Sequence, residues 1–173
     1  VAKVLSNENA GTVASADHGS WYRELFGPSV TAGILRPADL AGYRSGPVFI
    51  PRSTHVPPNR DAVRELMPAF FDLLEKEPEP AVRVVLGHFI FVYVHPYFDG
   101  NGRMGRFLMN VMLAAGGYPW VVVPVSRRKE YMEALEKASS EGNIRPFADF
   151  LGGLAEIVPE APLAEAQRNS KRG

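Results

Sequence analysis

The stretch HPYFDGNGRMGR, residues 95–106, gathers a histidine, an aspartate, an asparagine, three glycines and two arginines in twelve positions. Residues 100–105 fit G-x-G-x-x-G, the pattern of dinucleotide-binding turns. That pattern indicates a Rossmann fold when it stands between a strand and a helix, with an acidic residue about 20 positions further on. No Asp or Glu occurs between residues 107 and 129, and the preceding apolar segment has the length of a helix. The sequence therefore argues against a dinucleotide site.

The same glycines suit the binding of phosphate oxygens. Gly100 and Gly102 tolerate backbone conformations that are closed to other residues, so successive N–H groups can point into one concavity. A helix that opens at Arg103 adds unpaired N–H groups and the positive end of its dipole. Arg103 and Arg106 then share one face of the first turn. Asp99 would repel bound phosphates unless a cation such as Mg²⁺ lay between them.

His95 lies four residues before Asp99, where a neutral imidazole can take a proton from an incoming hydroxyl group. Each residue alone has an ordinary alternative: His95 could pair with the last helical carbonyls, Asp99 could form a turn, and the arginines could be solvated. Their combination beside the glycines favours a phosphate site. His88, seven residues before His95, is expected to be a hydrogen-bonded core residue.

Outward from this stretch, apolar residues recur with the 3.6-residue period of helices. Asn59 suits the N-cap of a helix whose apolar face runs to Leu74, with Pro68 inside it as a site of kinking. Residues 81–95 are too long an apolar run for a typical strand, so we predict a buried helix that Pro96 ends. Further helices are predicted over residues 21–26, 103–115, 127–138 and 146–157.

The segments between these helices carry turn signals. Residues 42–58 are rich in proline and glycine around Val48-Phe49-Ile50, which favours a short hairpin or an exposed extended segment. Val121-Val122-Val123 is ambiguous because a proline stands on each side of it. The tail, residues 159–173, is polar and is expected to fray.

Composition sets broad limits on function. A chain of 173 residues with 46% hydrophobic composition suits one globular domain. Nineteen basic and nineteen acidic residues balance, so net charge gives no argument for binding nucleic acid or a membrane. The chain has no cysteine, no apolar run of the roughly 20 residues that span a bilayer, and no signal-peptide pattern. We therefore expect a cytoplasmic location, in the source cell or in a host cell. The first residue is Val rather than Met, which favours a fragment of a longer protein.

Residues 95–106 closely resemble the signature of the Fic family, H-P-F-x-[DE]-G-N-G-R-x-x-R. The one departure is Tyr97, where phenylalanine is usual in the family and its ring packs inward. The resemblance extends more loosely from Gly33 to Leu151, and residues 42–58 look like the family's flap. Twelve positions of this kind make a highly specific signal.

This resemblance implies a mainly α fold: a compact helical bundle, the Fic fold, with a small β-hairpin flap beside the active site. It divides the chain into an N-terminal helical lead-in at residues 1–32, a Fic core domain at 33–157 and a polar tail at 158–173. Within the lead-in, the residues themselves predict one short helix, at 21–26, ended by Gly27-Pro28.

The resemblance also implies an activity, the transfer of AMP from ATP to the hydroxyl of a Tyr, Thr or Ser side chain in a target protein. By motif position, His95 would be the general base and Asp99 would hold Mg²⁺ against the α- and β-phosphates. Arg103 would contact the β-phosphate and Arg106 the γ-phosphate. The residues themselves agree, because phosphoryl-type transfer depends mainly on positioning and charge stabilisation.

The resemblance assigns further contacts. Gly100, Asn101 and Gly102 would cradle the α-phosphate, and Tyr131 would contact the adenosine. Flap residues would line the nucleotide and pair with the backbone of the target protein, as an added edge strand does. These flap residues are Val48, Phe49, Ile50 and Pro51.

Several alternatives stay open. A Fic-fold enzyme could instead transfer UMP, phosphate or phosphocholine, or remove AMP. A non-catalytic module that binds nucleotide as a regulatory signal is a hypothesis of another class. The family's inhibitory pattern, [ST]-x-x-x-E-[GN], is not matched, because Glu8-Asn9 follows Val4 and Glu141-Gly142 follows Lys137 at the Ser/Thr position. An inhibitor would lie outside this fragment, be a separate chain, or not exist, and the sequence leaves a homodimer open.

Overall fold

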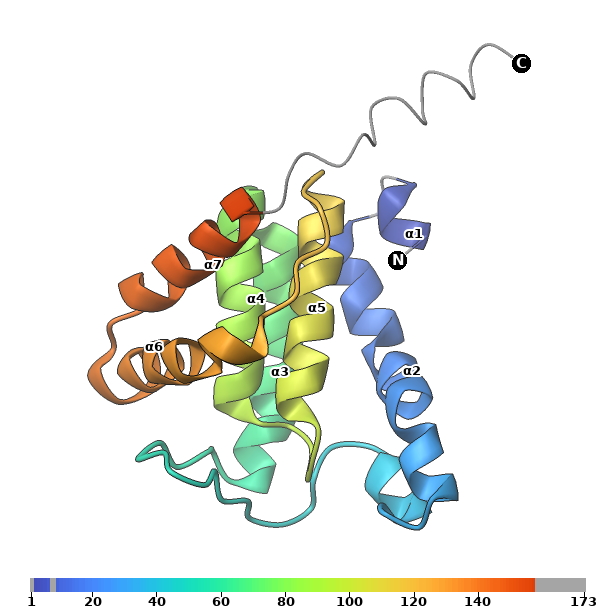
Figure 1. Cartoon of the computed structure of the whole chain (residues 1–173). Coiled ribbons are helices and arrows are strands. Elements are labelled where there is room, and N and C mark those ends of the chain that lie inside the picture. The colour runs from blue at the N-terminus through green and yellow to red at the C-terminus, as the bar shows by residue number, and fades with distance from the viewer. Residues whose placement is uncertain (1, 7–8, 158–173) are drawn as a thin grey trace.

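Two adjacent helices stand at the centre of the fold in the computed structural model, which describes residues 2–6 and 9–157. Helix α4 spans Pro80–Val94 and helix α5 spans Asn101–Ala115. Figure 1 shows the two helices side by side, and residues 95–100 connect their ends at the bottom of that view. The motif stretch is therefore the turn of a helical hairpin together with the first turns of its second helix.

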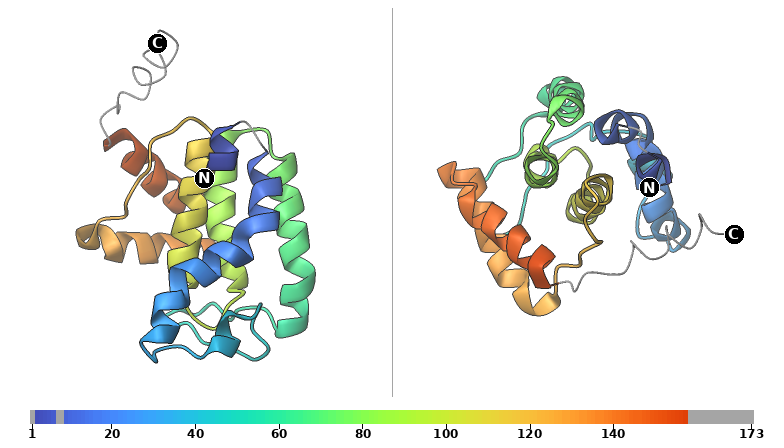
Figure 2. Two further views of the ribbon diagram at one scale, coloured as in Figure 1. Left: turned by 90° about the vertical axis from the view of Figure 1, so that its right-hand side faces the viewer. Right: turned by 90° about the horizontal axis from the view of Figure 1, so that it is seen from above.

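The other helices cover this central pair. Helix α2 spans Ala10–Thr31 and helix α3 spans Arg60–Lys76. Seen from above, α6 and α7 lie on one side of the central helices and α2 lies on the other (Figure 2). The remaining elements are α1 (Ala2–Leu5), η1 (Pro37–Leu40), η2 (Val125–Arg127), α6 (Arg128–Glu141) and α7 (Arg145–Ile157).

The core lies between these layers and draws on α1 to α7. Asn59 caps α3 as predicted, because its side-chain oxygen accepts from the backbone N–H groups of Asp61 at 3.0 Å and Ala62 at 2.9 Å. Pro68 lies inside α3. The largest fully buried apolar side chains are Tyr22, Phe26, Met67, Leu74, Phe91, Tyr97, Met104, Leu108, Met109, Met112 and Phe147.

The prediction for the N-terminal helix is wrong about both of its ends. Helix α2 begins at Ala10, with Asn9 as N-cap, and continues through Gly27-Pro28 to Thr31. Pro28 lacks the N–H that would donate to the Glu24 carbonyl oxygen, and the helix continues for only three residues beyond it. The early part of α2 was not predicted, because its buried residues are small and give only a weak helical period in the sequence. Their burial becomes evident only when α3 packs against them.

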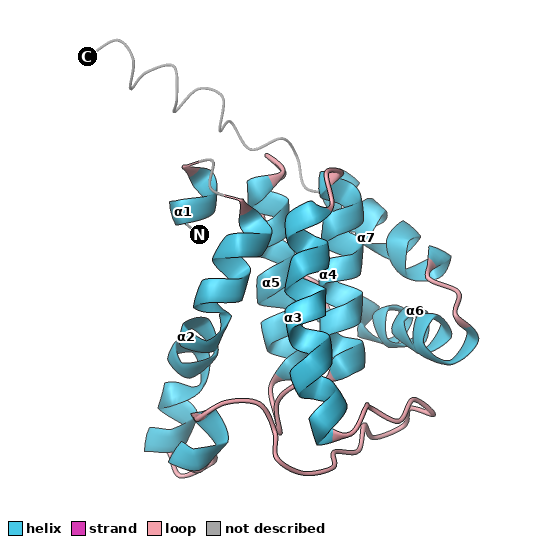
Figure 3. Ribbon diagram, turned by 180° about the vertical axis from the view of Figure 1, so that it is seen from behind, coloured by secondary structure: helices cyan, strands magenta, loops and turns pink. Residues whose placement is uncertain are grey.

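The predicted β-hairpin is not formed by residues 42–58, which are extended but pair with no strand. Helices and loops make up all of the described ranges (Figure 3). One backbone bond closes a turn in this segment, from the Ser53 N–H to the Ile50 carbonyl oxygen at 3.2 Å. Prolines lack the N–H that a β-ladder requires, and the segment holds Pro47, Pro51 and Pro57-Pro58. The other expectation, an exposed extended segment, holds in part, because residues 42–46 contain bends, residues 51–52 form a turn, and Arg44 and Pro57 are buried.

Smaller differences affect other segments. Helix α5 begins at Asn101 rather than Arg103. Val121 is not in a strand, and its backbone N–H and C=O both pair with the side chain of Asn110. Glu8 and the tail at 158–173 lie outside the described residues, and the proposed division into lead-in, core and tail stays a prediction. Within the described ranges, no helix combines the length and the apolar character needed to cross a membrane.

Helix α2 meets α3 at a glycine, which yields a test of the fold. A Cβ added at Gly11 would lie 2.2 Å from the Glu75 backbone nitrogen. We expect Gly11→Ala to lower the free energy of unfolding by about 1–3 kcal/mol, the usual range for overpacking, measured by urea denaturation. Gly19→Ala in the same helix is the control, because its Cβ would meet only the end of Arg23 at 3.7 Å. Equal stability of the two variants would contradict this packing.

Candidate active site

The turn between α4 and α5 begins at His95. His95 ends α4 with φ 53° and ψ 59°, in the left-handed region, and its N–H donates to the Phe91 carbonyl oxygen at 3.0 Å. A residue with a Cβ is less stable in that conformation by about 1–2 kcal/mol. Pro96 then prevents the helix from continuing. The turn therefore needs support from the rest of the fold.

Arg44 supplies that support from the loop that precedes α3. Its side chain is 1% exposed, and Nε donates to the His95 carbonyl oxygen at 2.8 Å. The same guanidinium donates to the carbonyl oxygens of Gly46 at 3.0 Å and of Pro58. One buried cation thus ties both ends of the extended segment to the end of α4.

Asn101 closes the turn from the other side. Its amide oxygen accepts from the Tyr97 backbone N–H at 2.9 Å, and its amide nitrogen donates to the Tyr97 carbonyl oxygen at 2.8 Å. Asn101 is 1% exposed. The Tyr97 ring packs inward, as the family resemblance implies, and stacks on Tyr22 with centroids 3.6 Å apart. The Asn101 side chain is therefore committed to the turn, which leaves its backbone N–H for a ligand.

Gly100 is required by conformation and by space. It has φ 79°, and a Cβ there would lie 2.1 Å from the Phe26 ring. Tyr22 fixes the neighbouring residue, because its hydroxyl donates to the Asp99 carbonyl oxygen at 3.0 Å. Gly102 differs from the prediction for it, since it lies inside α5 without a positive φ. Of the two glycines, only Gly100 therefore has a conformation that is closed to other residues.

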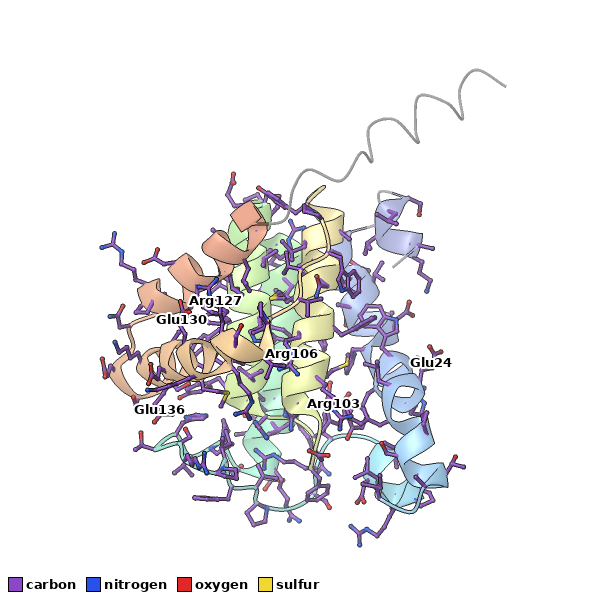
Figure 4. The ribbon with its side chains drawn as sticks, in the orientation of Figure 1. Glu24, Arg103, Arg106, Arg127, Glu130 and Glu136 are labelled. Carbon is purple, nitrogen blue, oxygen red and sulfur yellow. The ribbon has the colours of Figure 1, made fainter. Side chains whose placement is uncertain are left out.

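Helix α5 begins without a side-chain cap. Its first intrahelical bond runs from the Met104 N–H to the Gly100 carbonyl oxygen at 2.9 Å, so the amides of residues 101–103 have no helical acceptor. Arg103 and Arg106 project from this end of α5 (Figure 4). Cations at a helix N-terminus are unfavourable by about 0.3–1 kcal/mol each. A bound polyanion would reverse that effect and accept from the free amides.

The two arginines differ in their surroundings. The Arg103 guanidinium lies 3.7 Å from the Asp99 carboxylate and 4.3 Å above the centre of the Phe26 ring. Arg106 is half-buried, and its guanidinium carbon lies 6.0 Å from the centre of the Tyr131 ring. Arg103 therefore packs against α2, and Arg106 lies beside α6.

The imidazole of His95 is prepared to accept a proton. Its Nδ1 donates to the Val92 carbonyl oxygen at 3.2 Å, which leaves Nε2 as the nitrogen with a free lone pair. Burial lowers the pKa of His95 below its ordinary value of 6.5, and the positive charge of Arg44 adds to this effect. The ring is thus neutral at neutral pH.

A divalent cation fits the site only together with a phosphate ligand. Within residues 2–6 and 9–157, no group of three or more His, Cys and acidic side chains is placed to hold a metal. Asp99 offers a single carboxylate with 60% of its side chain exposed. Mg²⁺ commonly takes one or two carboxylates and completes its shell with phosphate oxygens and water. The donor set therefore suits Mg²⁺ that arrives bound to a polyphosphate.

Tyr131 lies deeper than the role implied for it suggests. It is 4% exposed, and its hydroxyl pairs with His88 Nε2 at 2.8 Å. The prediction that His88 is a hydrogen-bonded core residue is confirmed, since it is fully buried and burial lowers its pKa to about 4. The contact of Tyr131 with adenosine stays a prediction.

Residues 48–51 form a ribbon without regular structure in the segment that Arg44 ties to this site; Val48 and Ile50 are half-buried, and the side chain of Phe49 is 79% exposed. The sequence predicted the ribbon but missed the two residues that hold it. Arg44 was assigned to the flap without a role, and Glu136 on α6 was not singled out. No local pattern marks either residue, because each acts on residues distant in the chain, His95 for Arg44 and Ser53 for Glu136.

The fold and site define a class of protein, a helical bundle with an uncapped helix start, suited to phosphate groups, beside a neutral histidine. A family model described as "Fic/DOC family" matches residues 19–113. The chain belongs to the Fic/DOC family, as its motif predicts.

The chain is similar to curated proteins and to solved structures. It is 41% identical over 136 residues to the protein adenylyltransferase Fic of Nematostella vectensis, covering 76% of this chain and 31% of that protein. It is 37% identical over 128 residues to the protein of the same name from Drosophila willistoni, covering 72% and 25%. The chain thus spans a third or less of the length of these relatives.

Two solved structures support the fold. A Fic family protein from Desulfovibrio desulfuricans G20 superposes with a TM-score of 0.70 at 27% identity, covering 99% of this chain and 51% of that chain. Fic-1 (aa134–508) from C. elegans superposes with a TM-score of 0.69 at 28% identity, covering 88% and 41%. The mainly helical Fic fold that the sequence predicts is confirmed.

The bonds of Arg44 predict a large effect for a conservative change. Lysine keeps the charge but cannot reproduce the guanidinium fork, so Arg44→Lys leaves buried carbonyl oxygens without donors. We expect the free energy of unfolding to fall by about 1–3 kcal/mol, measured by urea denaturation. Arg64→Lys, on the exposed face of α3, should change it by less than about 0.5 kcal/mol. A fully stable Arg44→Lys protein would refute this role for Arg44.

Proposed function

We propose that this chain transfers AMP from ATP to a hydroxyl side chain of a target protein. The observation that carries the proposal is the neutral, oriented imidazole of His95, held by Arg44 beside the uncapped start of α5. A proton acceptor next to a polyphosphate site is what a hydroxyl nucleophile needs. The curated relatives described above, which share 37–41% identity with the matched part of this chain, are named protein adenylyltransferases.

The charge at the start of α5 supports the assignment of phosphate contacts. Arg103 and Arg106 would contact the β- and γ-phosphates. The backbone amides of residues 100–102 would donate to the α-phosphate, since the Asn101 side chain is occupied by Tyr97. Donors that are fixed before the substrate binds stabilise developing charge without reorganising.

Asp99 would hold Mg²⁺ with the phosphate oxygens completing its shell. The cation supplies charge neutralisation on the phosphates when bound. The carboxylate is exposed and only weakly paired with Arg103, at 3.7 Å, so a cation can compete for it. Arg103 would then turn from Asp99 to the phosphates.

In the proposed reaction the target hydroxyl is the nucleophile, and this chain supplies none. His95 Nε2 takes the proton of the target hydroxyl as that oxygen bonds to the α-phosphorus. The bond from the α-phosphorus to the oxygen that bridges to the β-phosphorus breaks, and pyrophosphate leaves. The chain's own contribution is to position the reactants and to stabilise charge, which dominate phosphoryl-type transfer.

The ribbon at residues 48–51 supports a place for the target protein. The ribbon is extended, lies on the surface and forms no β-ladder with the rest of the described chain. Its free backbone groups can accept an added strand, with main-chain bonds giving affinity. A target segment bound in this way would bring its hydroxyl group toward the His95 end of α4.

The reaction can be tested by labelling with two forms of ATP. In a lysate supplied with Mg²⁺, ATP labelled at the α-phosphate should transfer its label to a protein band, and ATP labelled at the γ-phosphate should not. His95→Ala should reduce the labelling by at least about 100-fold, the lower range for loss of a general base. Transfer of the γ-label would indicate a phosphate donor instead. Undiminished labelling by a folded His95→Ala protein would remove His95 from the role of base.

The pKa of His95 predicts an acid limb in the rate. The neutral form is the active one, and burial favours it, so its pKa lies below 6.5. The labelling rate should therefore rise with pH through a midpoint below 6.5 and stay level from pH 7 to 8. Circular dichroism at each pH serves as the control for unfolding. A midpoint above 7 for a folded protein would contradict the neutral imidazole.

A further inference from the structure

The extended segment before α3 is held by side chains instead of a β-ladder. Arg44 ties its two ends to the end of α4, as described above. Its middle, at Ser53 and Thr54, is held by Glu136, which lies on α6, an element far from it in sequence. Figure 4 shows Glu136 on the lower side of α6, which faces this segment.

Both oxygens of the Glu136 carboxylate are used in this contact. Oε2 accepts from the Ser53 hydroxyl at 2.5 Å, and Oε1 accepts from the Thr54 hydroxyl at 2.6 Å and the Thr54 backbone N–H at 2.7 Å. Hydrogen bonds to a carboxylate are shorter and stronger than those between neutral groups. The hydroxyls of Ser53 and then Thr54 hold the pKa of Glu136 below its ordinary value, so the carboxylate stays charged at neutral pH.

The backbone next to this contact is strained. Arg52 has φ 65°, a left-handed conformation that residues with a Cβ seldom adopt. The turn that contains it is closed by one backbone bond, from the Ser53 N–H to the Ile50 carbonyl oxygen. Strained conformations persist only where the surrounding structure holds them. Glu136 bonds the two residues directly after Arg52 and is therefore placed to hold this turn.

We propose that Glu136 is a positioning residue whose carboxylate latches Ser53 and Thr54 to α6, and so holds the ribbon at residues 48–51 in place for catalysis. The importance of this latch for catalysis rests on the proposed function, because the ribbon would line the nucleotide and pair with the target. The latch itself is a statement about the free protein. Losing it lets residues 48–54 sample other conformations, and binding must then restore the order at a cost in affinity.

Limited trypsin digestion tests, without any substrate, whether Glu136 holds this segment. Arg52 is exposed, and the bond to be cleaved, Arg52–Ser53, is flanked by the residues that Glu136 holds. We expect cleavage at this bond, identified by mass spectrometry, to be about tenfold faster in Glu136→Ala than in the wild type. Alanine suits a helix interior, so α6 should be retained. Glu133→Ala is the matched control, since Glu133 lies on α6 and pairs only weakly with Lys129, at 3.8 Å.

Labelling of the target protein then separates positioning from chemistry. We expect Glu136→Ala to raise KM for the target about tenfold and to leave the acid midpoint assigned to His95 unchanged, because Glu136 does not contact the imidazole. Thr54→Val should raise both the cleavage rate and KM, and the double variant should add little to either. Equal cleavage at Arg52 in wild type and Glu136→Ala would overturn the latch. Faster cleavage with an unchanged KM would overturn its positioning role.

The two proposals fail in different ways. If the wild type labels no protein at all, the proposed function fails, while the cleavage rates still decide whether Glu136 holds the segment. If labelling occurs and the cleavage rates are equal, the function stands and the latch is refuted.

Discussion

The buried guanidinium of Arg44 is the contact on which the site depends. Taking a cation out of water is unfavourable unless hydrogen bonds compensate it, and here the partners are carbonyl oxygens, including that of His95. Those carbonyls come from the end of α4 and from the extended segment. No shared helix or sheet joins these two described parts of the chain. The position of His95 and the position of the ribbon therefore both depend on the same side chain.

The start of α5 also depends on a small number of side-chain contacts. Asn101 closes the turn on Tyr97, and Tyr97 stacks on Tyr22 from α2. Phe26, also from α2, lies where a Cβ of Gly100 would have to be and also packs under Arg103. Helix α2 thus belongs to the site as well as to the core, although it contributes no group to the proposed chemistry.

Most of the helices and the motif turn could be predicted from the sequence, and each wrong prediction has a physical cause. The helices around the motif were predicted because each carries a strong apolar period or a clear cap, such as Asn59. Helix α2 was cut short because Gly27-Pro28 resembles a stop and the residues before Trp21 are small. A hairpin was one of two expectations for residues 42–58, and no ladder forms, because the prolines of this segment lack the N–H groups of a ladder. Side chains from Arg44 and Glu136 hold the segment instead.

The sequence alone determined the motif turn at residues 95–106, because the chemically distinctive side chains and the backbone requirements of that turn lie within twelve consecutive positions. It also determined the helical class, since periodicity is a local property. Only the tertiary structure decided how His95 is oriented and what holds the ribbon beside it. Those outcomes depend on Arg44, 51 residues before His95, and on Glu136, 83 residues after Ser53. No local pattern encodes a hydrogen bond between residues that meet only when the chain has folded.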